Sequence, residues 1–354
     1  MYFVAQNHCL LLGCSASFIP SVDLINATSL RAALFTGFSG PTDAIGTVVA
    51  RATHRFGNDN TLAPSPNAWP IFTEPLWTEV GTFPSDLVPG HPGCDLVLTG
   101  TVRSEKPVKR LHVSFKAGTF ATKIEVFGDR VWQVRGDELV PGEPQPFQEM
   151  PLTWAQAFGG TSDYEGIEAP YVLNAKGRGF YLQKPQAEGK PLPNLEWPDQ
   201  LITKWDDRPL PACFAPVVDP MTWNLADVAI AAKNAPDEEA RDDIIANAHE
   251  HCALSACQPR MIAPSIEPGD EIRIEHIGPE PIHFRLPAGS PIVRVSPGTE
   301  AFDVPLRMTA IFILLAQKLV VITYRTEFHY LYERRKKRTA TLLWNDSTAN
   351  AGGT

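Results

Sequence analysis

The stretch at residues 108–116, VKRLHVSFK, alternates apolar and polar side chains along its whole length. Leu111, Val113 and Phe115 fall on one face, and basic or polar residues separate them. An alternation with a period of two is typical of a β-strand that is buried on one side only. This stretch therefore predicts a half-buried strand.

Similar stretches lie on both sides of this strand in the sequence. Alternating or uniformly apolar runs occupy residues 95–102, 120–127, 271–276, 282–286, 310–316 and 319–324. Short turns such as Gly128-Asp129 and Gln317-Lys318 join neighbouring runs and leave little room for helices between them. Strands joined in this way pair antiparallel, so we expect antiparallel sheets.

The composition favours a large β protein. The chain has 354 residues, of which 44% are hydrophobic, together with 33 prolines and 25 glycines that disfavour long helices. We expect a mainly β fold, an antiparallel β-sandwich or open barrel with long loops. One domain would span residues 1–345, with a division into two intimate lobes, about 1–150 and 151–345, left open, and 346–354 would be a disordered tail.

One segment departs from the β pattern. Residues 224–254 contain few alternating stretches, and Pro236 is followed by three acidic residues at 237–239. Proline suits the first turn of a helix, and carboxylates there complement the positive end of the helix dipole. We expect a short helical insertion here and no helices before about residue 220.

Charge and hydropathy exclude several classes of partner. The formal net charge of −9 disfavours nucleic-acid binding, because the phosphate backbone rewards a basic surface. No run approaches the roughly 18 apolar residues that a membrane span needs. The N-terminus lacks the basic opening of a secretory signal, so we expect a cytoplasmic protein with reduced thiols.

The stretch PLTWAQAFGG, residues 151–160, has two glycines that raise the question of a phosphate loop. A phosphate loop needs its glycines before a helix, whereas Gly159 and Gly160 follow the helical part. Thr153 and Gln156 have the spacing of a capping box, which predicts a short helical turn. We expect one of the glycines to end that turn in the left-handed conformation.

A group of potential zinc ligands lies in HEHCALSAC, residues 249–257. His249, His251, Cys252 and Cys257 are of the right types, but adjacent His251 and Cys252 point about 100° apart on a helix. The alternative is a helix end with histidines near its negative terminus and a buried cysteine. No nucleophile motif accompanies the group, so we expect no catalytic, metal-binding or cofactor-binding residues.

Five motifs follow one another in an order that resembles a known family. They are DLVLTGTV (95–102), VFGDRVWQ (126–133), PFQEMPLTWAQAFGG (146–160), LNAKGRGF (173–180) and LPNLEWP (192–198). The series resembles the bacterial adaptor chaperones of type VI secretion. The resemblance implies a non-enzymatic protein that holds an effector toxin in the cytoplasm and loads it onto the VgrG spike.

The motifs single out positions whose role is packing or recognition. These positions are Gly128, Asp129, Arg130, Trp132, Trp154, Phe158, Gly159, Gly160, Asn174, Gly177, Gly179, Pro193 and Asn194. Asp129 and Arg130 are expected to form an ion pair at a hairpin. The chain departs from the family pattern at residues 224–254, which could accommodate a particular effector.

Two alternatives to the adaptor stay open. One is a metal-dependent hydrolase that uses the His249–Cys257 group, and the other is a structural component of the secretion apparatus. The sequence leaves the oligomeric state undetermined.

Overall fold

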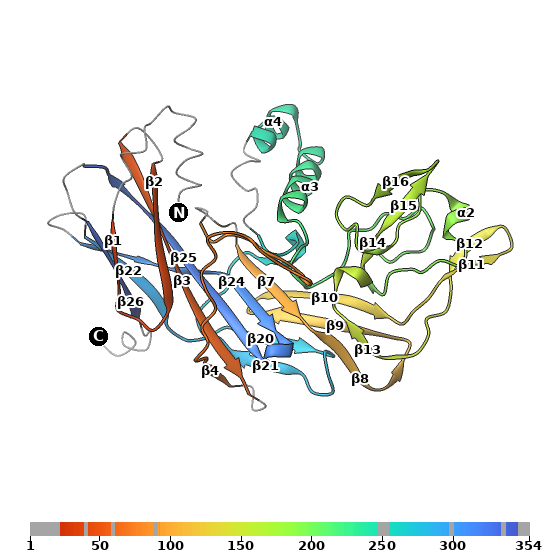
Figure 1. The fold of residues 1–354 in the computed structure, drawn as a ribbon, viewed down its shortest axis with the longest axis horizontal. Helices are drawn as coiled ribbons and strands as arrows, with labels where there is room; N and C mark the ends of the chain where they lie inside the picture. The colour runs from red at the N-terminus through yellow and green to blue at the C-terminus, as the bar shows by residue number, and fades with distance from the viewer. Residues whose placement is uncertain are drawn as a thin grey trace.

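The computed structural model describes residues 22–38, 42–57, 61–87, 91, 93–246, 255–296, 301–333 and 338–345. Its largest sheet has seven strands. In order across the sheet they are β19 (Ile262–Ala263), β7 (Cys94–Thr99), β24 (Arg307–Leu314), β25 (Leu319–Leu331), β3 (Asp43–Phe56) and β2 (Arg31–Phe38), with β4 (Leu62–Pro64) also paired to β3. Figure 1 shows the long strands β3, β25, β24 and β7 side by side.

A five-stranded sheet contains the stretch quoted first. Its order is β18 (Leu195–Glu196), β10 (Phe120–Phe127), β9 (Arg110–Ala117), β20 (Glu271–Glu275) and β21 (Ile282–Arg285), and every pair is antiparallel. In β9 the Val113 and Phe115 side chains are fully buried, and the basic side chains between the apolar ones face outward. The predicted half-buried strand is therefore confirmed.

The remaining strands form smaller sheets. A four-stranded sheet has the order β1 (Asp23–Asn26), β26 (Thr339–Asn345), β22 (Ser290–Ser296) and β23 (Phe302–Pro305). Two-stranded pairs are β13 (Phe147–Pro151) with β8 (Thr101–Val108), β11 (Trp132–Arg135) with β12 (Glu138–Pro141), β14 (Phe158–Gly159) with β17 (Arg178–Gly179), β15 (Thr161–Tyr164) with β16 (Ile167–Pro170), and β5 (Leu76–Thr78) with β6 (Gly81–Phe83). The described strands form open sheets, which confirms a mainly β, sandwich-like fold.

Two details of the predicted sheets are wrong. Strands β7 and β24 pair parallel, with Asp95 opposite Ala310, so the largest sheet is mixed. These strands lie far apart in the sequence, and no short turn forces them to run in opposite directions. The predicted single strand over residues 95–102 is divided at Gly100 into β7 and β8. The predicted hairpin of β24 and β25 is confirmed, and Lys318 takes the left-handed conformation between them.

Helices occupy more of the chain than the sequence predicts. The expected insertion is present as α3 (Pro220–Lys233) and α4 (Glu238–Ala246), which lie side by side above the sheets in Figure 1. Other helices precede or follow it: the 3-10 helix η1 (Trp154–Gln156), α2 (Lys184–Ala187), and the 3-10 helices η2 (Pro259–Met261) and η3 (Leu315–Gln317). The expectation of no helix before residue 220 is therefore wrong. Pro236 precedes α4, and the Asp237 carboxylate accepts the Ala240 amide at 2.8 Å.

The helical turn in PLTWAQAFGG forms, but without the expected caps. Thr153 precedes η1 and makes no side-chain capping hydrogen bond. The turn ends at Ala157 in extended backbone, and Gly159 lies in strand β14 with φ of +145°. The prediction that one of the two glycines ends the helical turn in the left-handed conformation is therefore wrong.

Buried apolar side chains form two clusters. The larger cluster joins the seven-stranded and five-stranded sheets and includes Trp154, Trp197 and Trp223. The second cluster is built around Trp132, Phe158 and Ile202. Within the described residues, no helix is both long and apolar enough to cross a membrane. The predicted tail at 346–354 lies outside the described residues.

Candidate interaction surface

The motif positions from separate stretches meet near the end of β10. Asn194 Nδ2 donates hydrogen bonds to the Phe127 carbonyl oxygen at 3.1 Å and to Asp129 Oδ1 at 3.0 Å. Arg178 Nη1 donates to Asn194 Oδ1 at 3.1 Å. One buried asparagine thus links three segments that are distant in the sequence.

Asn174 performs a similar task on the adjoining loop. Its Nδ2 donates to the Trp154 carbonyl oxygen at 2.8 Å and to the Phe158 carbonyl oxygen at 2.9 Å. Because the side chain is fully enclosed, it satisfies two backbone acceptors that water does not reach. The residue therefore holds η1 and β14 in their relative positions.

Asp129 and Arg130 do not pair with each other, so that prediction is wrong. The buried Arg130 guanidinium lies 3.9 Å from the Phe127 ring centroid and forms an ion pair with Glu196. Asp129 is exposed, and its carboxylate lies 3.7 Å from Arg178 Nη1. The two adjacent side chains therefore have different partners, one buried and one near the surface.

Glu196 is the most strongly perturbed carboxyl group of this region. Its Oε2 accepts the Ile202 amide at 2.9 Å, and Arg130 is its charged partner. Burial raises the pKa of Glu196 to about 7, and the nearby Arg130 charge opposes that rise. The pair is enclosed in the fold and offers no open position for a substrate.

Two motif glycines allow close backbone approach. A Cβ at Gly128 would lie 1.7 Å from the Gln145 carbonyl oxygen, and one at Gly159 would lie 2.1 Å from that of Asn174. Gly159 also has φ of +145°, which side chains disfavour. These positions require glycine for packing.

Most of the motif positions are buried, which indicates that they stabilise the fold. Of the thirteen positions, Gly177 is half-buried and Asp129 is exposed. The others are buried: Gly128, Arg130, Trp132, Trp154, Phe158, Gly159, Gly160, Asn174, Gly179, Pro193 and Asn194. The motif therefore defines the scaffold, and a surface for a partner must come from elsewhere.

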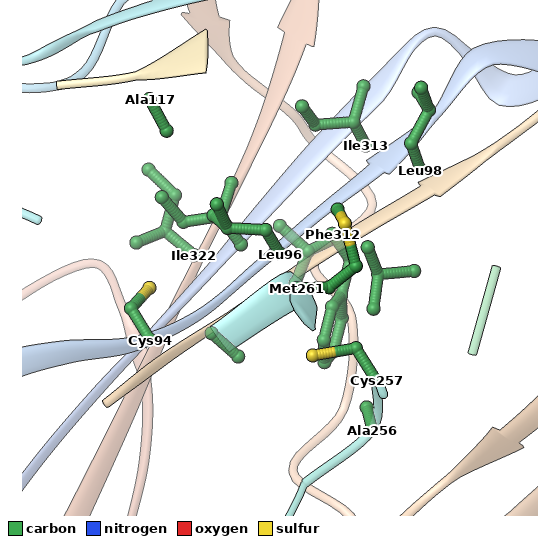
Figure 2. Packing of buried hydrophobic residues seen from close by; sticks show 14 of the residues in the cluster. Cys94, Leu96, Leu98, Ala117, Ala256, Cys257, Met261, Phe312, Ile313 and Ile322 are labelled. Carbon is green, nitrogen blue, oxygen red and sulfur yellow. The ribbon is translucent and has the colours of Figure 1, made fainter. Parts of the chain in front are cut away.

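The proposed zinc ligands are only partly within the described residues. His249, His251 and Cys252 lie outside them. Cys257 is 2% exposed, and Figure 2 shows it in the same buried cluster as Met261 and Phe312. Burial raises the pKa of the Cys257 thiol, which disfavours the thiolate that zinc requires. Among the described residues, no group of three or more His, Cys, Asp or Glu could hold a metal ion.

A groove of about 730 Å³ lies between β4 and β21. His54, His283 and Glu271 line it, and Arg285 Nη2 lies 3.9 Å from a Glu271 carboxylate oxygen. Burial lowers the pKa of His54, so this imidazole is neutral at neutral pH. The groove is open and carries mixed charges, but it does not present the nucleophile and base pair of a hydrolase.

The α3–α4 hairpin is anchored by tryptophan packing. The Trp223 ring of α3 lies 5.4 Å from the Trp154 ring, centroid to centroid, and Trp154 Nε1 donates to the Pro216 carbonyl oxygen at 2.6 Å. Asp219 caps α3 by accepting the Met221 amide at 3.1 Å. The first turn of α3 is therefore held against the β body.

Among the described residues, one side of α3 carries apolar side chains that are only partly covered. At 100° per residue, one stripe within roughly 100° of the circumference lies opposite the buried Trp223. Its members are Met221, Leu225, Val228, Ala229 and Ala232. Met221 is 53% exposed, Leu225 is 50% exposed and Ala229 is also exposed, whereas Val228 and Ala232 are half-buried. We call these five residues the apolar stripe.

The hairpin that carries the apolar stripe is acidic. Residues 219–246 include two basic residues, Lys233 and Arg241, so their formal charge is −5. The seven acidic residues are Asp219, Asp227, Asp237, Glu238, Glu239, Asp242 and Asp243. An exposed apolar stripe on a hairpin of net negative charge has the chemistry of a docking surface for a complementary protein element.

The sequence carries a signal for this stripe, and the predicted helical insertion over 224–254 includes all of its residues except Met221. Apolar residues at 221, 225, 228, 229 and 232 have helical spacing, and so do those on the opposite face. Of the tryptophans in the motifs and loops, Trp154, Trp197 and Trp223 are buried in the core. Trp77 is 71% exposed and belongs to no motif.

Comparison with known families places the chain in one of them. Residues 42–325 match the family described as "Uncharacterized protein conserved in bacteria (DUF2169)", and the chain belongs to this family. No curated protein and no solved structure matches the chain significantly.

Proposed function

We propose that this protein is a cytoplasmic adaptor that binds a type VI secretion effector and promotes its loading onto a VgrG-type spike protein. The observation that supports the proposal is the exposed apolar stripe of α3. Met221 and Leu225 are about half exposed there, and neighbouring apolar side chains exposed on one helix favour a protein partner. The proposal that the partner is an effector comes from the five motifs, whose order resembles that of the adaptor chaperones.

The motif positions and the helical hairpin have separate roles, which is consistent with a protein that binds a partner without catalysing a reaction. The motif positions hold a rigid β body through the Asn174 and Asn194 hydrogen bonds. The short hairpin presents its apolar side chains from that body. A preorganised surface loses less entropy on binding than a flexible one, which suits a chaperone that must retain its client.

The test is a tagged pull-down from a native host in which the secretion genes are expressed, with the recovered proteins identified by mass spectrometry. We expect one toxin-like protein in stoichiometric amount, with or without a VgrG spike. Leu225→Asp should reduce its recovery, whereas Val172→Asp should not, because Val172 is equally apolar and 76% exposed on another part of the molecule. Recovery of the tagged protein alone, from cells that contain spike and effectors, would contradict the proposal.

The same cells separate the adaptor from its two alternatives. An adaptor stays in the cell when the spike is secreted, whereas a structural component of the apparatus leaves with it. A metal-dependent hydrolase requires stoichiometric zinc in the purified protein, and that zinc should be lost in Cys257→Ala.

A further inference from the structure

We infer that the apolar stripe of α3 docks a basic amphipathic helix of the partner protein. The inference depends on the proposed function only for the identity of the partner, which would be the effector that the adaptor binds. The chemistry of the docked element comes from the hairpin itself, whose shape and charge are independent of the family resemblance.

The form of the stripe favours a helix as its occupant. The exposed members of the stripe, Met221, Leu225 and Ala229, follow one i, i+4 ridge of α3 over roughly 12 Å, at a rise of about 1.5 Å per residue. Two large side chains, Met221 and Leu225, are followed by small Ala229 and Ala232, which let another helix approach closely. Such a ridge fits the groove between apolar side chains at positions i, i+3, i+4 and i+7 of a second helix.

The charges decide which helix binds. The hairpin has a formal charge of −5; Glu238 and Asp242 lie near Arg241 of the same helix, and Glu239 and Asp243 on α4 are exposed as well. Lysine or arginine residues beside the apolar face of the partner helix would meet these carboxylates. Complementary charges of this kind increase the association rate and exclude acidic competitors.

The same charges disfavour two other occupants. A second copy of this chain would bring two acidic hairpins together, and like charges in close contact repel. An anionic lipid surface would be repelled in the same way, since membrane-binding helices carry basic polar faces.

The experiment measures binding of a fluorescent model helix to the full-length protein by anisotropy. The probe is a leucine–lysine peptide of about 18 residues with leucines at helical spacing, a length that forms a marginal helix alone. One control peptide has glutamate in place of lysine, and a second has the same composition in scrambled order. We expect the amphipathic basic peptide to bind at least about tenfold more tightly than either control.

Variants locate the site. Leu225→Asp and, as an independent substitution, Met221→Ser should each weaken binding of the basic peptide by at least about tenfold. Val172→Asp, which places a carboxylate at an exposed apolar position elsewhere, and Glu143→Lys, which reverses an exposed charge elsewhere, should each leave it unchanged. Far-UV circular dichroism establishes that each variant is folded.

Three results with the purified protein would overturn the inference: equal binding of the scrambled peptide, equal binding to Leu225→Asp, or a wild-type dimer that Leu225→Asp converts to a monomer. A native pull-down that recovers the client equally with wild type and Leu225→Asp would reject this site and leave the adaptor function standing. Tight, stripe-dependent binding of the peptide without any recovered client would support the docking chemistry and reject the adaptor function.

Discussion

Replacing Asp86 with alanine tests how the largest sheet tolerates its buried charges. Asp86 Oδ1 accepts a hydrogen bond from Arg51 Nη2 at 2.7 Å, and Arg325 Nη2 lies 3.9 Å from the same oxygen. Asp86 Oδ2 accepts the Phe72 amide at 2.7 Å. All three charged side chains are buried. The substitution therefore removes the carboxylate that pairs with the enclosed Arg51 guanidinium and that, with Glu327 and Asp95, compensates the charge of Arg325.

The size of the effect follows from these contacts. Breaking a buried ion pair by removing one partner costs about 3–5 kcal/mol of unfolding free energy, because the remaining charge is uncompensated. Here the Phe72 amide also loses its acceptor, which places the Asp86→Ala variant at the upper end of that range. Domains of ordinary stability have about 5–15 kcal/mol in total, so the loss is large.

A control variant in an exposed ion pair separates the energetic effect of burial from that of the ion pair itself. Asp199 forms two hydrogen bonds with Arg260, at 2.7 and 2.8 Å, but its side chain is largely exposed. Asp199→Ala should lower the unfolding free energy by no more than about 1 kcal/mol. Urea unfolding followed by tryptophan fluorescence measures both variants, with equal slopes required for the comparison. Equal losses in the two variants would refute the argument that burial determines the cost.

Three further predictions follow from buried groups. Asn174→Ala should lower the unfolding free energy by about 2–4 kcal/mol in urea, because two backbone carbonyls lose their donor; a loss below about 1 kcal/mol would contradict this. Burial raises the pKa of Glu196 from 4.5 to about 7, so the folded protein keeps a proton that the unfolded chain has released between these values. The stabilisation from this group is complete below about pH 4.5 and is lost as the pH rises through about 7. Over this range the unfolding free energy of wild type should therefore fall relative to that of Glu196→Gln, and parallel pH profiles would reject this prediction. Burial raises the pKa of the thiols of Cys94, Cys213 and Cys257, so iodoacetamide followed by peptide mapping should find them unmodified in the folded protein and modified in urea; labelling without urea would contradict their burial.

Local sequence patterns determined the elements of this protein. The alternation in VKRLHVSFK predicts β9, and the apolar runs around Gln317-Lys318 predict the hairpin of β24 and β25. The proline and acidic residues at 236–239 predict a helical insertion. These features could be inferred because strand periodicity and turn chemistry act over a few neighbouring residues.

Tertiary structure decided how those elements combine and what they expose. The parallel pairing of β7 with β24, the hydrogen bonds of Asn174 and Asn194, and the burial of Cys257 all join residues far apart in the chain. Trp223 and Leu225 are both apolar residues of α3, but packing against Trp154 buries Trp223 and leaves Leu225 half exposed. Periodicity predicts that a helix has an apolar face, whereas the neighbours that fill the space around it determine whether that face becomes core or surface.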